Sequence, residues 1–94
     1  MSTTRINRFV AKAGQAEALK AFLSQLIPYI TASTGCEGCE LFQQENQKTE
    51  FYIVEKWHSK ADHQASIAGF PKEKMQAAMD LLAEAPQGNY YQLC

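Results

Sequence analysis

The sequence predicts a single α+β domain, in which strands and helices follow one another in the order β-α-β-β-α-β. Two features of the residue pattern support this prediction. Apolar and polar residues alternate in short segments, which is typical of strands. In the segments between them, apolar residues recur three and four residues apart, which is typical of helices. The 94 residues suffice for one domain over positions 1–94, with no visible linker or internal repeat.

Composition and charge exclude several classes of protein. The apolar share of 46% and the charged share of 20% exclude a disordered chain. Nine basic and ten acidic residues are scattered along the chain, so nothing predicts a surface for nucleic acid. No apolar run approaches the roughly 20 residues that cross a bilayer, and residues 1–8 lack the apolar core of a signal peptide. We therefore expect a cytoplasmic protein without nucleic-acid or membrane partners.

The first part of the chain has the pattern of a strand followed by a long helix. Side chains alternate in character over residues 4–12, which predicts the strand. The helix opens near Gly14 and ends before Gly35, a natural terminator. Pro28 falls inside this helix and should bend its axis. The apolar positions of the helix are Ala16, Leu19, Phe22, Leu23, Leu26, Ile27 and Ile30.

Two strands joined by a polar turn are expected next. Residues 39–45 and 50–58 have strand character, and the short polar segment between them predicts a hairpin. Ser59, followed three residues later by Asp62, resembles a capping box. This pattern predicts a short helix that runs to about Ala68.

A second short helix and a last strand complete the chain. Pro71 suits the first turn of a helix, Pro86 would stop it, and residues 90–93 are the expected last strand. The buried stripe of this helix is predicted to consist of Met75, Ala78, Met79 and Leu82. The complete order predicts a ferredoxin-like βαββαβ sandwich, in which the helices cover one face of the sheet.

The strand over residues 50–58 has apolar side chains on both faces. Two sets point in opposite directions: Phe51, Ile53, Glu55 and Trp57 against Tyr52, Val54, Lys56 and His58. Since the helices of this fold cover only one face, the other needs a partner, and a second copy is the simplest one. The sequence therefore predicts a homodimer. The alternative is a monomer with a partly apolar outer face.

Three residues could carry chemistry, and each has a purely structural alternative. Glu55, on a largely apolar strand face, must be paired or hydrogen-bonded. It is either a catalytic base or the partner of Arg5 or Arg8 in an ion pair. Trp57 is either core packing or a pocket wall whose indole N–H reaches a ligand oxygen. His63 either faces the pocket and accepts a proton near neutral pH, or is a solvated side chain.

Three more side chains are candidates for lining the same space. Asn7 lies in a strand where an apolar residue is expected, and its amide offers both a donor and an acceptor. Tyr29 and Phe42 could contribute aromatic walls.

The three cysteines are predicted to be reduced thiols. Cys36 and Cys39 form a Cys-x-x-Cys pair, but this pair follows a helix and enters a strand, the reverse of the redox arrangement. A zinc site needs four ligands, and Cys94 and the histidines follow no recognised spacing. We therefore expect no metal.

These motifs resemble the antibiotic biosynthesis monooxygenase (ABM) domain family, particularly its small quinol monooxygenase-like members. The resemblance covers nearly the whole chain. It rests on Ala13-Gly14-Gln15 before the long helix, Gly35-Cys36 with Cys39-Glu40-Leu41-Phe42, Glu55-Lys56-Trp57 before Ser59, and the closing run from Leu81 to Pro86 with Tyr90-Tyr91.

The resemblance implies a dimeric α/β barrel with one pocket in each subunit, between the helices and the sheet. It also implies a monooxygenase without metal, flavin or haem, acting on a small quinol or phenol whose phenolate itself reduces dioxygen. In this interpretation the catalytic residues are His63 as the base and Trp57 and Asn7 as positioners of oxygen atoms. The residues expected to bind substrate are Tyr29, Phe42, Ile53 and Glu55.

The chain departs from the family pattern in the short helix. Members often carry a histidine about nine residues after the tryptophan, where this chain has Ser66, and His63 lies one turn earlier. The haem-degrading branch has a tryptophan in that helix, and this chain has none there. Because relatives also include isomerases and proteins with no known reaction, two alternatives stay open. One is a non-catalytic small-molecule-binding or stress-associated dimer, and the other is an isomerase of a small oxygenated metabolite.

Overall fold

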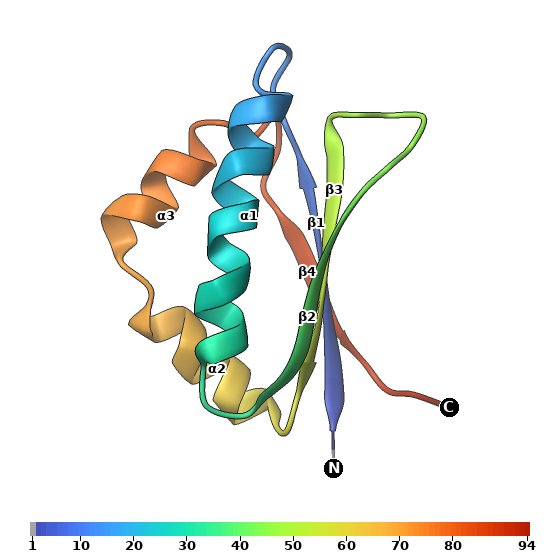
Figure 1. The fold of residues 1–94 in the computed structure, drawn as a ribbon, viewed down its shortest axis with the longest axis vertical. Coiled ribbons are helices and arrows are strands. Elements are labelled where there is room, and N and C mark those ends of the chain that lie inside the picture. The colour runs from blue at the N-terminus through green and yellow to red at the C-terminus, as the bar shows by residue number, and fades with distance from the viewer. Residues whose placement is uncertain (1) are drawn as a thin grey trace.

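Over residues 2–94, which the computed structural model describes, four strands form one antiparallel sheet in the order β2-β3-β1-β4. The strands are β1 (Thr3–Val10), β2 (Cys36–Gln43), β3 (Glu50–Trp57) and β4 (Gln87–Tyr91). The helices α1 (Ala16–Ala32), α2 (Lys60–Gly69) and α3 (Lys72–Met79) lie on one side of the sheet (Figure 1). This arrangement confirms the predicted ferredoxin-like sandwich.

The core lies between α1 and the inner face of the sheet. The predicted spacing in α1 places Leu19, Leu23 and Ile30 toward the sheet, where they are buried. They belong to one cluster with the alternate, fully buried side chains of β3: Phe51, Ile53 and Trp57. Pro28 lies inside α1 and does not end it. At the start of α2, the Ser59 hydroxyl accepts the Asp62 backbone N–H at 3.2 Å, as the capping pattern predicted.

The outer face of the sheet is also partly apolar. Ile6, Val10, Tyr52 and Val54 are half-buried there, and Phe42 and Tyr91 are about half exposed. No helix of the described chain covers this face (Figure 1). The same helices also lack the length and apolar character that a membrane span requires.

Strand β2 differs from its predicted bounds. It begins at Cys36 instead of residue 39, because Gly35 has a φ of +83° and turns the chain straight from α1 into the sheet. An irregularity in the pairing between Cys36 and Gly38 then shifts the register. The strand ends at Gln43, and β3 ends one residue earlier than predicted, at Trp57.

The last helix and strand also differ from the prediction. Helix α3 ends at Met79, well before Pro86, and Leu82 is buried outside it, in a bridge with Ala11. The predicted stripe is therefore partly wrong, since Met79 is 40% exposed. Strand β4 begins at Gln87 instead of residue 90, because it pairs with β1.

Candidate active site

A cavity of about 210 Å³ lies between the helices and the inner face of the sheet. Much of its wall is apolar: Phe9, Leu26, Ile30, Ile53, Trp57, Ile67, Phe70, Met75 and Pro86. Its polar side chains are Arg5, Asn7, Tyr29, Glu55, His63 and Ser66. A cavity of about 150 Å³ holds benzene. The space therefore admits one substituted aromatic ring.

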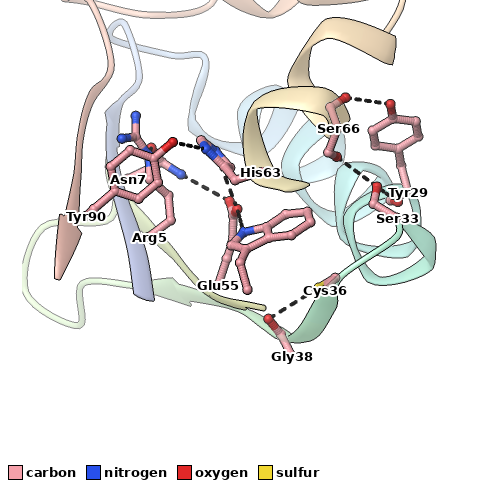
Figure 2. A network of polar contacts seen from close by, with 11 residues as sticks. Arg5, Asn7, Tyr29, Ser33, Cys36, Gly38, Glu55, His63, Ser66 and Tyr90 are labelled. Atoms are coloured by element: carbon pink, nitrogen blue, oxygen red, sulfur yellow. Dashed lines mark hydrogen bonds and ion pairs between the residues drawn. The ribbon is translucent and has the colours of Figure 1, made fainter. Parts of the chain in front are cut away.

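Strand register and helix geometry bring the polar residues together. The antiparallel pairing of β1 with β3 sets Asn7 opposite Ile53 and Arg5 opposite Glu55. Directly opposed residues point to the same face of a sheet, so all four line the cavity floor. His63 enters from above, from α2 (Figure 2).

Glu55 is the buried charge at the centre of the network in Figure 2, with only 3% of the residue exposed. Its Oε1 accepts the indole N–H of Trp57 at 2.8 Å, and its Oε2 accepts the Asn7 amide at 3.1 Å. Burial raises the pKa of this carboxyl, while the Trp57 hydrogen bond, the Arg5 charge and the Asn7 hydrogen bond act in the opposite direction. The carboxyl is therefore poised to exchange a proton at higher pH than an ordinary glutamate.

Neither predicted arginine forms an ion pair with Glu55. Arg8 points to the other face of β1, where it contacts Glu50 at 3.0 Å and Glu84 at 2.7 Å. Arg5 shares the face of Glu55 but leans toward β4, and its Nε donates to Asn7 Oδ1 at 3.1 Å. The Asn7 amide thus connects the guanidinium to the carboxylate.

His63 is buried beside Glu55, with 4% of the residue exposed. Its Nδ1 lies 2.5 Å from the Tyr90 hydroxyl, and its Nε2 lies 3.9 Å from Glu55 Oε1, beyond hydrogen-bond distance. Burial and the Arg5 charge lower the pKa of His63 to about 4. The imidazole is therefore neutral at pH 7. It is oriented by Tyr90, and its Nε2 is left for a ligand.

A second set of hydrogen bonds joins α1 to α2 at the other side of the cavity (Figure 2). The Tyr29 hydroxyl donates to the Ser66 carbonyl at 2.7 Å, and the Ser33 and Ser66 hydroxyls lie 2.8 Å apart. Ser66 occupies the position where ABM members often carry histidine. In this chain Ser66 of α2 forms hydrogen bonds with α1, and His63, one turn earlier in α2, enters the cavity.

Six of the seven predicted site residues share the cavity: Asn7, Tyr29, Ile53, Glu55, Trp57 and His63. The prediction for Phe42 is wrong. It pairs with Tyr52 on the outer face and is 49% exposed. Leu41 and Phe42 are adjacent and both apolar, so alternation alone does not show which one points inward; the pairing of Leu41 with the buried Ile53 decides it.

The indole N–H of Trp57 has a partner within the chain. Trp57 is both fully buried in the core cluster and part of the cavity wall, so the structure combines the two alternatives. Its indole N–H donates to Glu55, two residues earlier on the same strand face. Sequence reasoning missed Tyr90 as the partner of His63 and Arg5 as a cavity residue. The signal for Arg5 was available, because it lies two residues before Asn7 and so shares its face.

The cysteines do not join this site. The described chain has no disulfide, and Cys36, Cys39 and Cys94 are free. Burial raises the pKa of Cys39 to about 12 and also raises that of Cys36, so both thiols stay protonated at neutral pH. Within residues 2–94, no three His, Cys, Asp or Glu side chains gather as metal ligands.

Comparison with known proteins gives one family and many structural neighbours. No curated protein matches the chain significantly. Among solved structures, Rv0793 of Mycobacterium tuberculosis is 20% identical with a TM-score of 0.87, covering 100% of this chain and 96% of its own. PA3566 of Pseudomonas aeruginosa is 25% identical with a TM-score of 0.84, covering 99% and 95%.

A third neighbour has a stated activity. SnoaB of Streptomyces nogalater, a cofactor-independent oxygenase, is 13% identical with a TM-score of 0.82, covering 98% of this chain and 92% of its own. At this identity the likeness shows a shared fold. The model of the antibiotic biosynthesis monooxygenase family matches residues 3–81, most of the chain. The chain therefore belongs to the antibiotic biosynthesis monooxygenase family.

Proposed function

We propose that the protein is a monooxygenase that needs no cofactor and acts on a small quinol or phenol. The observation that carries the proposal is a buried carboxylate beside a buried neutral imidazole in one largely apolar cavity. Burying Glu55 and His63 costs free energy that a hydrocarbon core would not. Family membership supports the reaction class. The fold shared with SnoaB supports the scaffold.

The space between the two groups suits a substrate hydroxyl. His63 Nε2 and Glu55 Oε1 are 3.9 Å apart, so an oxygen atom about 2.8 Å from each fits between them. We assign the Tyr90 hydroxyl as the donor to Nδ1, which is the tautomer with the ring hydrogen on Nε2. The substrate hydroxyl then donates to Oε1 and accepts from Nε2.

Glu55 is the proton acceptor in this mechanism, and His63 takes the role of a neutral donor. A pKa of about 4 makes His63 a weak base, whereas burial brings the pKa of Glu55 closer to that of a phenol. Once the proton has moved to Glu55, the phenolate oxygen keeps its hydrogen bond from Nε2. Asn7 and Trp57 act by positioning Glu55.

The substrate supplies all the electrons in the proposed reaction. A quinol phenolate reduces dioxygen. One oxygen atom bonds to a ring carbon and converts its C–H into C–OH, and the other oxygen atom leaves as water with the two hydroxyl hydrogens of the quinol. The product is a hydroxyquinone. The apolar walls exclude bulk water and hold the ring against the polar end of the cavity.

Oxygen uptake with methylhydroquinone tests this proposal, with autoxidation subtracted. We expect equimolar consumption of oxygen and quinol without hydrogen peroxide, and a loss of roughly a hundredfold or more in Glu55→Gln. Glu45→Gln, which removes an exposed carboxylate from a loop, is the matched control and should keep full activity.

Three outcomes would contradict the oxygenase proposal. The first is no uptake with any of a panel of quinols, and the second is equal uptake by Glu55→Gln and the wild type. The third is a product formed equally well without oxygen, which favours an isomerase. A quinol that raises the melting temperature but returns unchanged favours the non-catalytic binding dimer.

We also propose that the outer face of the sheet is covered by a second copy of the chain. The apolar side chains of that face, such as the half-buried Val54 and the half-exposed Phe42, support a dimer with about 800 Å² buried per subunit. Sedimentation at micromolar concentration should give the dimer mass for the wild type and the monomer mass for Val54→Asp. A monomeric wild type would contradict this proposal.

A further inference from the structure

We infer that the substrate carries an anionic group, such as a carboxylate, and that Arg5 selects it. This inference rests on the proposed function and narrows its substrate class to acidic single-ring quinols and phenols. The juxtaposition that carries it is an unpaired guanidinium and the proposed hydroxyl site of Glu55 and His63 in one cavity.

The Arg5 guanidinium has hydrogen-bond donors without a side-chain partner in the described chain. Arg5 is half-buried and lines the cavity. Within residues 2–94 no carboxylate lies within 4.0 Å of its guanidinium, whereas Arg8 on the other face has two such partners. Its only side-chain hydrogen bond in the described chain runs from Nε to Asn7. The Nη groups therefore keep free hydrogen-bond donors, and a pair of such donors matches the two oxygen atoms of a carboxylate.

The guanidinium is held in place by its surroundings. Its central carbon lies 4.7 Å from the centre of the Tyr90 ring, within cation–π distance. Gly88 of β4 leaves space for the guanidinium, because a Cβ at that position would overlap both the Arg5 guanidinium and Asn7 Oδ1. A side chain stacked and hydrogen-bonded in this way is ordered before a ligand arrives, which reduces the entropy lost on binding.

The anion site and the hydroxyl site lie at different places on the cavity floor. Arg5 leans toward β4, whereas Glu55 lies on β3, and Asn7 of β1 sits between them. The Asn7 amide accepts from Arg5 and donates to Glu55. A ring can therefore present its hydroxyl to Glu55 and His63 and its anionic group to Arg5. Lys60, with its Nζ 5.3 Å from the centre of the Tyr90 ring, adds a second positive charge near that ring.

Binding under argon tests the inference apart from turnover. We would titrate the protein with 2,5-dihydroxybenzoate and with methylhydroquinone, which share the quinol ring and differ in charge. In the wild type the acid should bind roughly ten- to a hundredfold more tightly. Arg5→Gln should abolish this preference, and Arg5→Lys should keep part of it. Lys20→Gln, which removes an exposed charge from α1, should leave it unchanged.

Gly88→Ala offers a second test that removes no charge. The added methyl group should displace Asn7 Oδ1 and the Arg5 guanidinium together. Both quinols should then bind more weakly, and the acid, which also loses its contact with Arg5, should lose more affinity than methylhydroquinone. Melting temperatures check that each variant is folded. If Gly88→Ala does not fold, the Arg5 variants alone test whether Arg5 selects the acid.

Equal affinity of the wild type for the two quinols, or a preference that survives in Arg5→Gln, would overturn the inference. Neither result would affect oxygen uptake with methylhydroquinone, on which the proposed function stands. Conversely, an Arg5-dependent preference in a protein that consumes no oxygen would leave the anion site standing and remove the oxygenase.

Discussion

Glu50 and Glu55 belong to the same strand, β3, but enter opposite environments. Glu50 is the first residue of the strand and lies on the outer face of the sheet. There it accepts hydrogen bonds from the Tyr52 hydroxyl and from Arg8, and these contacts lower its pKa. Glu55 points inward, where burial raises its pKa. An odd number of positions along the strand separates them, and this places them on different faces.

The two glutamates differ in what their charges contribute: Glu50 suits the stability of the fold, and Glu55 suits chemistry. Glu50 has a nearby cation and solvent, so its charge costs the fold little. Glu55 has no cation within ion-pair distance in the described chain, and neighbours that donate to both of its oxygens. A buried carboxylate held in this way serves chemistry better than stability. The inner face therefore carries the proposed reaction, and the outer face the proposed assembly.

The largest expected effect comes from removing the aromatic wall of the inner face. Trp57→Ala should lower the free energy of unfolding by about 3–5 kcal/mol, because it empties a fully buried position and leaves Glu55 without its indole donor. Urea denaturation of the variant and of the wild type measures the change. In the Val54→Asp background, which should keep the chain monomeric, Phe42→Ala on the outer face should cost less than half as much, because Phe42 is 49% exposed in the single subunit. An equal loss of unfolding free energy in the two variants would contradict the difference in burial between the inner and outer faces.

A smaller effect is expected from the pH dependence of stability. The native pKa of His63 is about 4, against an ordinary 6.5, so between these values the unfolded chain binds a proton that the native protein does not. The stability that neutral His63 contributes is present above pH 6.5 and is lost as the pH falls to about 4.

Comparison with His63→Gln isolates this contribution. Between pH 7 and pH 4 the wild type should lose roughly 2–3 kcal/mol more unfolding free energy than the variant. The raised pKa of Glu55 acts with the opposite sign in both proteins and largely cancels in the comparison. Parallel pH profiles in urea denaturation would show that His63 is solvated.

The smallest effect is expected from removing one hydroxyl. Tyr90→Phe deletes the contact with His63 Nδ1, which should cost about 1 kcal/mol of stability and lower oxygen uptake about tenfold, because the ring hydrogen is no longer directed to Nε2. Tyr91→Phe, the next residue along β4 and on the outer face, is the matched control and should change neither quantity. If both variants behave alike, Tyr90 does not orient the imidazole.

Regular periodicity in the sequence made much of the fold predictable. The alternation in residues 50–58 correctly assigned the inward face of β3, and with it Ile53, Glu55 and Trp57. The three-and-four spacing from Ala16 to Ile30 correctly predicted α1 and its buried side. Both patterns are long enough for local residue order to decide the structure.

The parts that sequence reasoning missed depend on contacts between distant segments. Phe42 points outward because it pairs with Tyr52 on the outer face, and alternation alone does not decide which of the adjacent apolar residues Leu41 and Phe42 points inward. The start of β4 is set by its pairing with β1, so the meeting of Tyr90 with His63 could not be read from residues 27 positions apart. The ion-pair prediction for Glu55 failed because Arg5 turns toward the space above Gly88.

Labelling with ¹⁸O₂ tests the central claim most directly, the claim that Glu55 and His63 activate a quinol for oxygenation. Product is quenched early from wild type, Glu55→Gln and Glu45→Gln. We predict one labelled oxygen atom, in the added hydroxyl group of the hydroxyquinone, from the wild type and Glu45→Gln, and only the autoxidation background from Glu55→Gln. Equal labelling in all three proteins, or background labelling throughout, would contradict the account.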